Sequence, residues 1–201
     1  MNSIANDQIT TNTMRSAQYK RPGKKQIPIN NAVSPSDGNR EPSMTDKHAI
    51  QDVLSQYVRA TDERDGDAQA RLFADNGMIR FFGRSGTEEY QLAGEPVIGA
   101  ERIRHHMEGF PPRPERTYQH HITTDHPIRV NGAEATMNAQ FLVFSSVAAP
   151  KPEDGCQAPS GVKGEITLIM IGYYDSDLRK IDGAWKLTRL DVKHSLPVFM
   201  G

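Results

Sequence analysis

The sequence predicts an α+β fold in which N-terminal helices pack against one face of a curved antiparallel sheet. Two observations carry this prediction. Apolar side chains recur every three or four positions between residues 48 and 62, which is the period of an amphipathic helix. From Thr117 the pattern becomes that of extended strands, and Asn131-Gly132 and Asp182-Gly183 mark tight hairpin turns between them.

The first 44 residues differ in composition from the rest of the 201-residue chain. They contain few large apolar side chains and no helical or strand period, so they cannot bury enough surface to offset the entropy cost of ordering. Six of their side chains are basic and three are acidic, a balance of +3 that leaves −4 of the net charge of −1 to the remainder. We therefore predict a disordered tail over 1–44 and one folded domain over 45–201.

The first predicted helix begins near Thr45 or Asp46, either of which can cap it, and Gly66 ends it. Asp67 can then cap a second short helix over 68–73.

A short strand and a third helix follow. Residues 75–77 have the composition of a turn, which leads into a strand over 78–82 and a polar loop over 83–95. A helix is expected over 100–107, and the prolines at 111, 112 and 114 end it.

Four longer strands are predicted in the second half of the chain, at 117–130, 134–147, 165–174 and 185–193. A Pro/Gly/Ser-rich excursion over 148–163 separates the second strand from the third. The central strands carry apolar side chains at successive positions, so both faces of the sheet are apolar. Because the helices cover only one face, we expect a second copy of the chain on the other, as part of a homodimer or trimer.

One carboxylate lies on the apolar side of the first helix. Asp62 follows Val58 by four positions and Leu54 by eight, so it points to the same side as these two residues. An acid in such surroundings needs a partner, because an unpaired buried carboxylate is costly. We expect Asp62 to face a cavity; the alternative is that it caps the end of the helix.

A strand histidine is the expected partner of Asp62. His120 and His121 are neighbours in an extended segment, so their side chains point to opposite faces and one of them faces inward in any register. A carboxylate fixes the tautomer of a paired imidazole and raises its basicity, which suits the ring to move a proton near neutral pH. Tyr57, on the same helix as Asp62, can present its hydroxyl to the same cavity. The alternative is that the inward histidine is a core residue bonded to the backbone.

Other kinds of chemistry are not indicated by the sequence. His105 and His106 are successive residues of a helix and diverge by about 100°, so we expect them on the surface rather than as metal ligands. The single cysteine, Cys156, excludes an intrachain disulfide and fits a reducing compartment. The small net charge points to neither nucleic acid nor a membrane surface, and no apolar run reaches the roughly 20 residues that span a bilayer. We expect a cytoplasmic protein without a metal or cofactor.

Several stretches occur together in a particular order. They are Tyr57-x4-Asp62 with the acids that follow it, LFADNG at 72–77, HHIT at 120–123, IRVNGAEA from Ile128, and IDGAWKL at 181–187. Their order and spacing resemble those of SnoaL-like domains, which belong to the nuclear transport factor superfamily. Such domains form a cone of helices against a bent antiparallel sheet around a deep apolar cavity, and the resemblance implies this fold for 45–201.

The resemblance extends to scytalone dehydratase and the bile-acid dehydratases, which place a Tyr and an Asp on the first helix and a His on the strand after the third helix. Scytalone dehydratase has a second histidine on a later strand, and the corresponding residues 164–166 here contain none. His120 matches the first strand histidine better than His121 does. The resemblance therefore implies three catalytic residues, Tyr57, Asp62 and His120. We further expect substrate contacts from His121, Phe144 and Met170.

The expected function is that of a cofactor-independent lyase or isomerase, dehydratase-like, acting on a small apolar metabolite of polyketide or steroid type that bears a carbonyl or hydroxyl group. His120 would remove a proton next to the carbonyl, Asp62 would stabilise the imidazolium, and Tyr57 would donate a hydrogen bond to the oxygen that gathers charge. Two alternatives of the same fold stay open: a non-catalytic ligand-binding or dimeric interaction module, and a subunit associated with a hydroxylase or dioxygenase.

Overall fold

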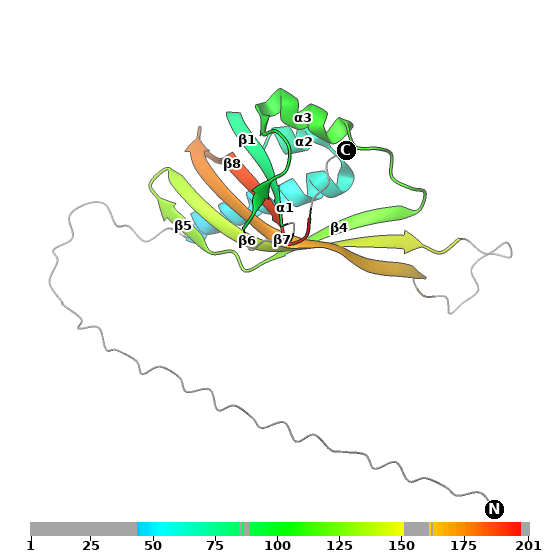
Figure 1. Cartoon of the computed structure of the whole chain (residues 1–201). Helices are drawn as coiled ribbons and strands as arrows, with labels where there is room; N and C mark the ends of the chain where they lie inside the picture. The colour runs from blue at the N-terminus through cyan, green and yellow to red at the C-terminus, as the bar shows by residue number, and fades with distance from the viewer. Residues whose placement is uncertain (1–43, 85, 87–88, 151–160, 162, 198–201) are drawn as a thin grey trace, which may run out of the picture. The chain divides into compact units, whose positions relative to one another are not determined.

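The structure, a computed structural model, describes residues 44–84, 86, 89–150, 161 and 163–197. Within this part, three helices cover one face of a curved, open sheet (Figure 1). The predicted α+β class is confirmed. The predicted tail over 1–44 lies outside the described residues, apart from Met44.

Helix α1, Met44–Glu63, buries the apolar row predicted from the sequence. The buried side chains on this row are Ile50, Val53, Leu54, Tyr57 and Val58. The helix ends before Gly66, because Arg64 adopts a left-handed φ of 59° and the Asp65 amide donates to the Ala60 carbonyl at 2.8 Å. None of the described helices is long and apolar enough to cross a membrane.

Helix α2, Gly66–Ala70, begins one residue after its cap. The cap is Asp65, whose carboxylate accepts a hydrogen bond from the Ala68 amide at 2.8 Å; the predicted cap, Asp67, lies inside the first turn. Gly66 is required here by close packing, since a Cβ at this position would lie 2.6 Å from the Arg104 carbonyl oxygen of α3.

Strand β1, Phe73–Gly83, starts five residues earlier than predicted. A register shift between Phe73 and Met78 absorbs the turn-like residues 75–77 as an irregularity within the strand. Two short strands follow, β2 (Gln91–Leu92) and β3 (Val97–Ile98). Helix α3, Ala100–Glu108, then agrees with the predicted helix to within one residue.

The remaining strands belong to the same sheet. They are β4 (Thr117–Thr124), β5 (Ile128–Asn131), β6 (Glu134–Ala148), β7 (Gly164–Ile181) and β8 (Ala184–His194). The strand order is β2-β1-β8-β7-β6-β4, with β3 beside β1 and β5 beside β6. The pairs predicted by the two hairpin turns are antiparallel, but β1 and β8 pair in parallel, so the sheet is mixed at this point.

The core lies between the helices and the inner face of the sheet. Its largest fully buried side chains include Ile50 and Leu54 of α1, Ile103 of α3, and Phe141 and Leu187 of the sheet. These residues come from both halves of the chain, so the helices depend on the sheet for their burial.

A register shift between β6 and β7 bends the sheet beside the core. Val143 pairs with Met170, but the next residue, Phe144, pairs with Leu168, so Ile169 is the extra residue of a β-bulge. The bulge changes the phase of alternation along β7, which decides which of its side chains face the helices.

The outer face of the sheet has two halves of different character. Over β4, β6 and β7 it exposes large apolar side chains, namely Tyr118, Ile122, Ile166 and Leu168. Over β1, β8 and β7 it carries ion pairs: both nitrogens Nε and Nη2 of Arg80 donate to the buried Asp191 carboxylate at 2.7 Å, and Arg189 Nε donates to Asp177 at 2.7 Å. The charged side chains of the ionic half are paired with one another within the chain. The apolar half is not covered by the described residues of this chain.

Candidate active site

A cavity of about 960 Å³ lies between the helices and the inner face of the sheet. Its wall is mostly apolar and includes Phe81, Met107, Phe141, Ile169, Met170 and Val192. This volume and lining suit a small, largely apolar ligand. Polar side chains also line the cavity, among them Tyr57, His106, His121, Tyr174 and His194.

Asp62 and His121 form a hydrogen-bonded pair at the wall of this cavity. His121 Nδ1 lies 2.6 Å from Asp62 Oδ1, and the His121 backbone amide donates to Asp62 Oδ2 at 2.9 Å. The side chain of His121 is only 9% exposed and that of Asp62 only 13%. Both carboxylate oxygens are therefore engaged by one residue, which holds the imidazole ring in a single orientation.

The expected pairing of Asp62 with His120 is wrong. In β4, His121 lies opposite the fully buried Val143 and faces the cavity, whereas His120 lies opposite Phe144 on the exposed outer face. The expected substrate contact of Phe144 is wrong for the same reason, because directly paired residues share a face. Met170 does line the cavity, since the β-bulge turns it inward.

Tyr57 lies on the same cavity wall, where its ring packs edge-on against Tyr174 with centroids 5.8 Å apart. Burial raises the pKa of both tyrosines above the ordinary value of 10.0, and for Tyr174 the nearby Tyr57 and Asp62 raise the pKa further. Both hydroxyls are therefore protonated at neutral pH and can donate hydrogen bonds. The sequence predicted this role for Tyr57 alone and gave no indication of Tyr174.

His194, at the end of β8, is another polar group of the cavity that sequence reasoning missed. Its ring contacts Phe141 with centroids 5.6 Å apart. Burial, and secondarily the nearby His121, lowers the pKa of His194 below its ordinary value, so its imidazole is neutral at pH 7. The signal in the sequence was the alternation Leu190, Val192, His194, which continues the inward face of the last strand.

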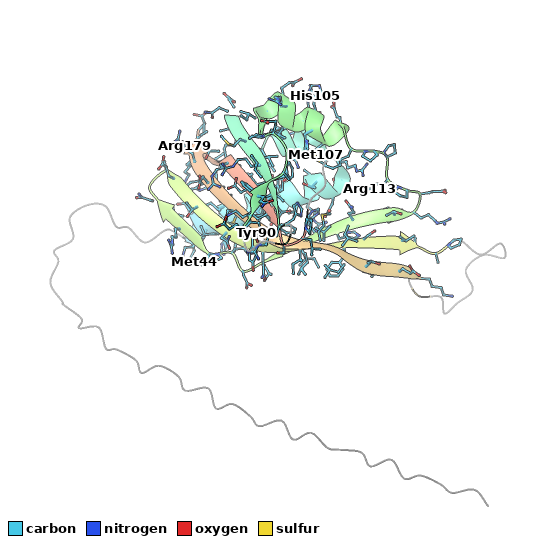
Figure 2. The ribbon with its side chains drawn as sticks, in the orientation of Figure 1. Met44, Tyr90, His105, Met107, Arg113 and Arg179 are labelled. Atoms are coloured by element: carbon cyan, nitrogen blue, oxygen red, sulfur yellow. The ribbon has the colours of Figure 1, made fainter. Side chains whose placement is uncertain are left out.

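His106 also lines the cavity, although a surface position was expected for it. It follows the buried Ile103 by three positions and therefore shares its side of α3. His105 does lie at the surface, where Nδ1 is 2.8 Å from the Glu101 carbonyl oxygen (Figure 2). The successive histidines thus have different surroundings, as helical geometry requires.

Two arginines support the end of α1 that carries Asp62. Arg113 donates to the Asp62 carbonyl oxygen and, at 3.5 Å, to that of Thr61, so it adds a hydrogen-bond donor to carbonyls at the C-terminal end of the helix. Arg64 donates to the Pro111 carbonyl oxygen, and its guanidinium lies 6.0 Å from the Phe110 ring centroid. These contacts tie the loop after α3 to the helix end and hold Asp62 opposite β4.

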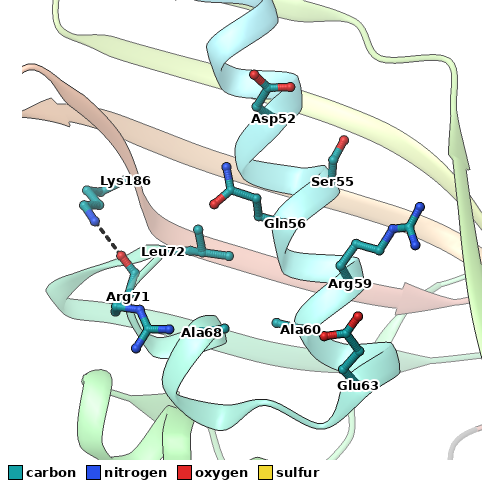
Figure 3. Close-up of a pocket in the computed structure, with 10 residues that line it drawn as sticks. All are labelled: Asp52, Ser55, Gln56, Arg59, Ala60, Glu63, Ala68, Arg71, Leu72 and Lys186. Carbon is teal, nitrogen blue, oxygen red and sulfur yellow. Dashed lines mark hydrogen bonds between the residues drawn. The ribbon is translucent and has the colours of Figure 1, made fainter.

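A second hollow, of about 540 Å³, lies on the outer side of α1 and α2 (Figure 3). Its charged side chains are Asp52, Arg59, Glu63, Arg71 and Lys186. Lys186 Nζ donates to the Arg71 carbonyl oxygen at 2.5 Å. The mixed charges face solvent, which weakens them as reacting groups, so the candidate active site is the larger, apolar cavity. No group of three or more His, Cys, Asp or Glu side chains in the described part of the chain is arranged to hold a metal ion.

Residues 42–191 match the family of SnoaL-like domains. The chain belongs to this family. The cavity described above, between helices and a curved sheet, is therefore that of a SnoaL-like domain. No curated protein matches the sequence.

Solved structures with low sequence identity share the fold of this SnoaL-like domain. The β subunit of a proposed aromatic-ring-hydroxylating dioxygenase from Novosphingobium aromaticivorans is 15% identical, with a TM-score of 0.58 over 79% of this chain and 94% of that one. A Catenulispora acidiphila protein in complex with S-DNPA is 19% identical, with a TM-score of 0.54 over 75% and 93%. ActVI-ORFA from Streptomyces coelicolor is 14% identical, with a TM-score of 0.53 over 75% and 98%. Identities this low show the fold alone.

The cavity of this SnoaL-like domain has the groups needed for proton transfer. When the His121 ring is neutral and donates from Nδ1 to Asp62, its Nε2 has a free lone pair and can accept a proton. The carboxylate then stabilises the imidazolium that forms. The hydroxyls of Tyr57 and Tyr174 supply hydrogen-bond donors on the neighbouring wall.

Proposed function

We propose that this protein is a cofactor-independent lyase or isomerase, dehydratase-like, that acts on a small, mostly apolar metabolite bearing a carbonyl or hydroxyl group. The observation that carries the proposal is the Asp62–His121 pair, with 2.6 Å between Oδ1 and Nδ1, at the wall of an apolar cavity. A protein that only binds an apolar ligand gains nothing from a nearly buried carboxylate–imidazole pair, which is costly to desolvate.

In the proposed reaction, His121 Nε2 removes the proton from the carbon next to the substrate carbonyl. The electron pair of the broken C–H bond forms an enolate, whose oxygen accepts hydrogen bonds from the tyrosine hydroxyls. The imidazolium then gives the same proton to a leaving β-hydroxyl, which departs as water, or to another carbon, which yields an isomer. General acid–base catalysis of this kind supplies about 10²–10⁴-fold in rate.

His194 has a supporting role in this scheme. Its neutral imidazole can hydrogen-bond the hydroxyl that leaves, so that the oxygen is oriented toward His121. It thereby takes the place of the second strand histidine that residues 164–166 lack, from a different strand of the sheet.

The proposal is tested without knowledge of the natural substrate by proton exchange. The natural protein is incubated with 2-tetralone, an apolar bicyclic ketone, in D₂O, and deuterium uptake next to the carbonyl is followed by NMR. We expect uptake above the buffer rate in the natural protein and in His120→Ala, and uptake at the buffer rate in His121→Ala. Uptake in His121→Ala equal to that of the natural protein would refute the role of the pair.

The same fold also admits a non-catalytic binding module or a subunit of a ring-hydroxylating enzyme. The likeness to the Novosphingobium β subunit supports the second alternative only at the level of fold. Deuterium uptake that depends on His121 separates the proposed enzyme from both alternatives.

We also infer that a second copy of this chain covers the apolar half of the outer face, in a homodimer. Ile122 is 51% exposed, Ile166 74% and Leu168 49%, and they lie on strands that pair through β6. A contiguous apolar patch of this kind on a sheet is typical of an interface. The ion pairs beside it are already satisfied, so the apolar half is the part that gains from association.

A further inference from the structure

An arginine lies at the opening of the large, mostly apolar cavity. Among the described residues that line this cavity, Arg64 is the only arginine, lysine, aspartate or glutamate. Phe110 and Leu196 also line the cavity and are 46% and 54% exposed, so the cavity opens to solvent beside them. The Arg64 guanidinium lies 6.0 Å from the Phe110 ring centroid and therefore belongs to this opening. A single charged group in an apolar site is typical of one that orients and selects the ligand.

Arg64 occupies a backbone position at which glycine is usual. It follows the last residue of α1 and has a left-handed φ of 59°. Its amide donates to the Thr61 carbonyl at 3.2 Å, and the next amide, that of Asp65, donates to the Ala60 carbonyl at 2.8 Å. These two bonds form a Schellman motif, whose left-handed residue is most often glycine because glycine has no Cβ. An arginine is less favourable here for the backbone, which points to a role for its side chain.

No carboxylate among the described residues pairs with Arg64. Its Nη1 donates to the Pro111 carbonyl oxygen, which leaves Nε and Nη2 without partners in the described part of the chain, and neither of them is shielded from solvent. The acids beside it in the sequence are engaged elsewhere. The Asp65 carboxylate accepts from the Ala68 amide, and Glu63 lines the second hollow on the outer side of α1 (Figure 3). The Nε–Nη2 edge of the guanidinium is therefore free to bind a ligand.

A second arginine adds to the positive charge at this opening. Arg113 donates only to backbone carbonyl oxygens among the described residues, those of Thr61 and Asp62, so its charge is not neutralised by a carboxylate. Desolvation, and secondarily the positive charge of Arg113, lower the pKa of Arg64, although the guanidinium stays charged at neutral pH. Two like charges held near each other repel, and an anion bound beside them offsets this repulsion.

We propose that Arg64 is a specificity-determining residue that binds a carboxylate of the ligand through Nε and Nη2 at the opening of the cavity. The ligand is then an amphipathic monoanion, with its apolar body in the cavity and its carboxylate at the opening. A carboxylate matches this edge of a guanidinium, as Asp191 does at Arg80, where both distances are 2.7 Å. One arginine on the lining balances one negative charge, which favours a carboxylate over a dianionic phosphate. This inference rests on the proposed function only in placing the reacting end of the ligand at His121.

The test compares two probes with the same apolar body, 4-cyclohexylbutanoate and 4-cyclohexylbutan-1-ol, whose binding to the full chain is measured by isothermal titration calorimetry. We expect the natural protein to bind the carboxylate about 10-fold more tightly than the alcohol, the effect of a charge-assisted hydrogen-bonded pair at a partly exposed site. Arg64→Gln removes the positive charge and is expected to bind the two probes equally. Arg64→Gly also removes it and suits the left-handed φ, so it serves as a second variant should the glutamine variant fold poorly.

The matched control is Arg59→Gln, the same change at an exposed arginine that lines the second hollow, and it should retain the preference for the carboxylate (Figure 3). Equal binding of the two probes by the natural protein, binding of neither, a preference that survives in both Arg64 variants, or its loss in Arg59→Gln would overturn the inference. Binding needs no turnover, and 2-tetralone is uncharged. An absent preference with intact deuterium exchange therefore counts against this inference alone, and absent exchange with an intact preference counts against the proposed function alone.

Discussion

Replacing Asp62 by asparagine is the change that tests the proposed catalytic role of the Asp62–His121 pair most directly. Asparagine has the shape of aspartate, and its side-chain oxygen can still accept the hydrogen bond that the His121 amide donates at 2.9 Å to Oδ2. Its amide nitrogen then faces His121 Nδ1, which must accept instead of donate. The ring proton moves to Nε2, so this nitrogen loses the free lone pair that is proposed to take the substrate proton.

The size of the effect follows from what is removed. We expect deuterium exchange of 2-tetralone to fall by about 10²–10⁴-fold, because general base catalysis and the oriented tautomer are lost together. The free energy of unfolding should fall by only about 1–2 kcal/mol, the difference between a hydrogen bond to a charged group and one to a neutral group. Urea denaturation measures the second quantity independently of activity.

The double variant decides whether the two residues act as a unit. His121→Ala removes the base itself, so adding Asp62→Asn to it should lower the exchange rate no further. His120→Ala is the matched control on the outer face of the same strand and should leave the rate unchanged. Losses that multiply in the double variant, or a large loss in His120→Ala, would refute the reasoning.

Three further predictions concern pH, packing and association. His106 and His194 have lowered pKa values in the folded protein, so the unfolded chain binds more protons: stability is complete above the ordinary pKa of 6.5 and falls as the pH drops through and below it. Urea denaturation at pH 7.5 and 5.5 should show this loss, and the double change to phenylalanine should reduce it. Gly66→Ala should cost about 1–3 kcal/mol by thermal denaturation, because its Cβ would lie 2.6 Å from a backbone oxygen of α3, whereas Gly109→Ala meets only contacts of 3.5 Å or more and should cost less than 1 kcal/mol. Leu168→Lys places a charge in the inferred interface and should convert the dimer to a folded monomer, as measured by sedimentation velocity. A natural protein that sediments as a monomer at micromolar concentration would contradict the inferred interface.

Local patterns in the sequence were sufficient for the three helices, for the strand pairs joined by the two hairpin turns, and for one half of the candidate site. The 3.6-residue period of the first helix placed Tyr57 on its buried side and Asp62 toward the strand histidines. The hairpin turns at Asn131-Gly132 and Asp182-Gly183 joined the strand pairs expected. These features depend on residues a few positions apart, and short-range stereochemistry determines them.

The other half of the site depended on contacts between distant segments. Alternation along a strand requires that His120 and His121 face opposite ways, but it does not state which one faces inward. That choice is made by the pairing of β4 with β6, more than twenty residues later, which sets His121 opposite Val143. A single bulged residue changes the phase again and brings Met170 inward while Phe144 stays on the outer face.

The sequence by itself therefore determined the α+β class, the order of the helices and the longer strands, and the side of the first helix that carries the acid. Only the tertiary structure decided the parallel pairing of β1 with β8, the inward histidine of β4, and the convergence of His106 and His194 on one cavity. The physical reason is that a local period fixes the relative orientation of neighbouring side chains, whereas the face that becomes the inside is chosen by the long-range packing that buries the most apolar surface.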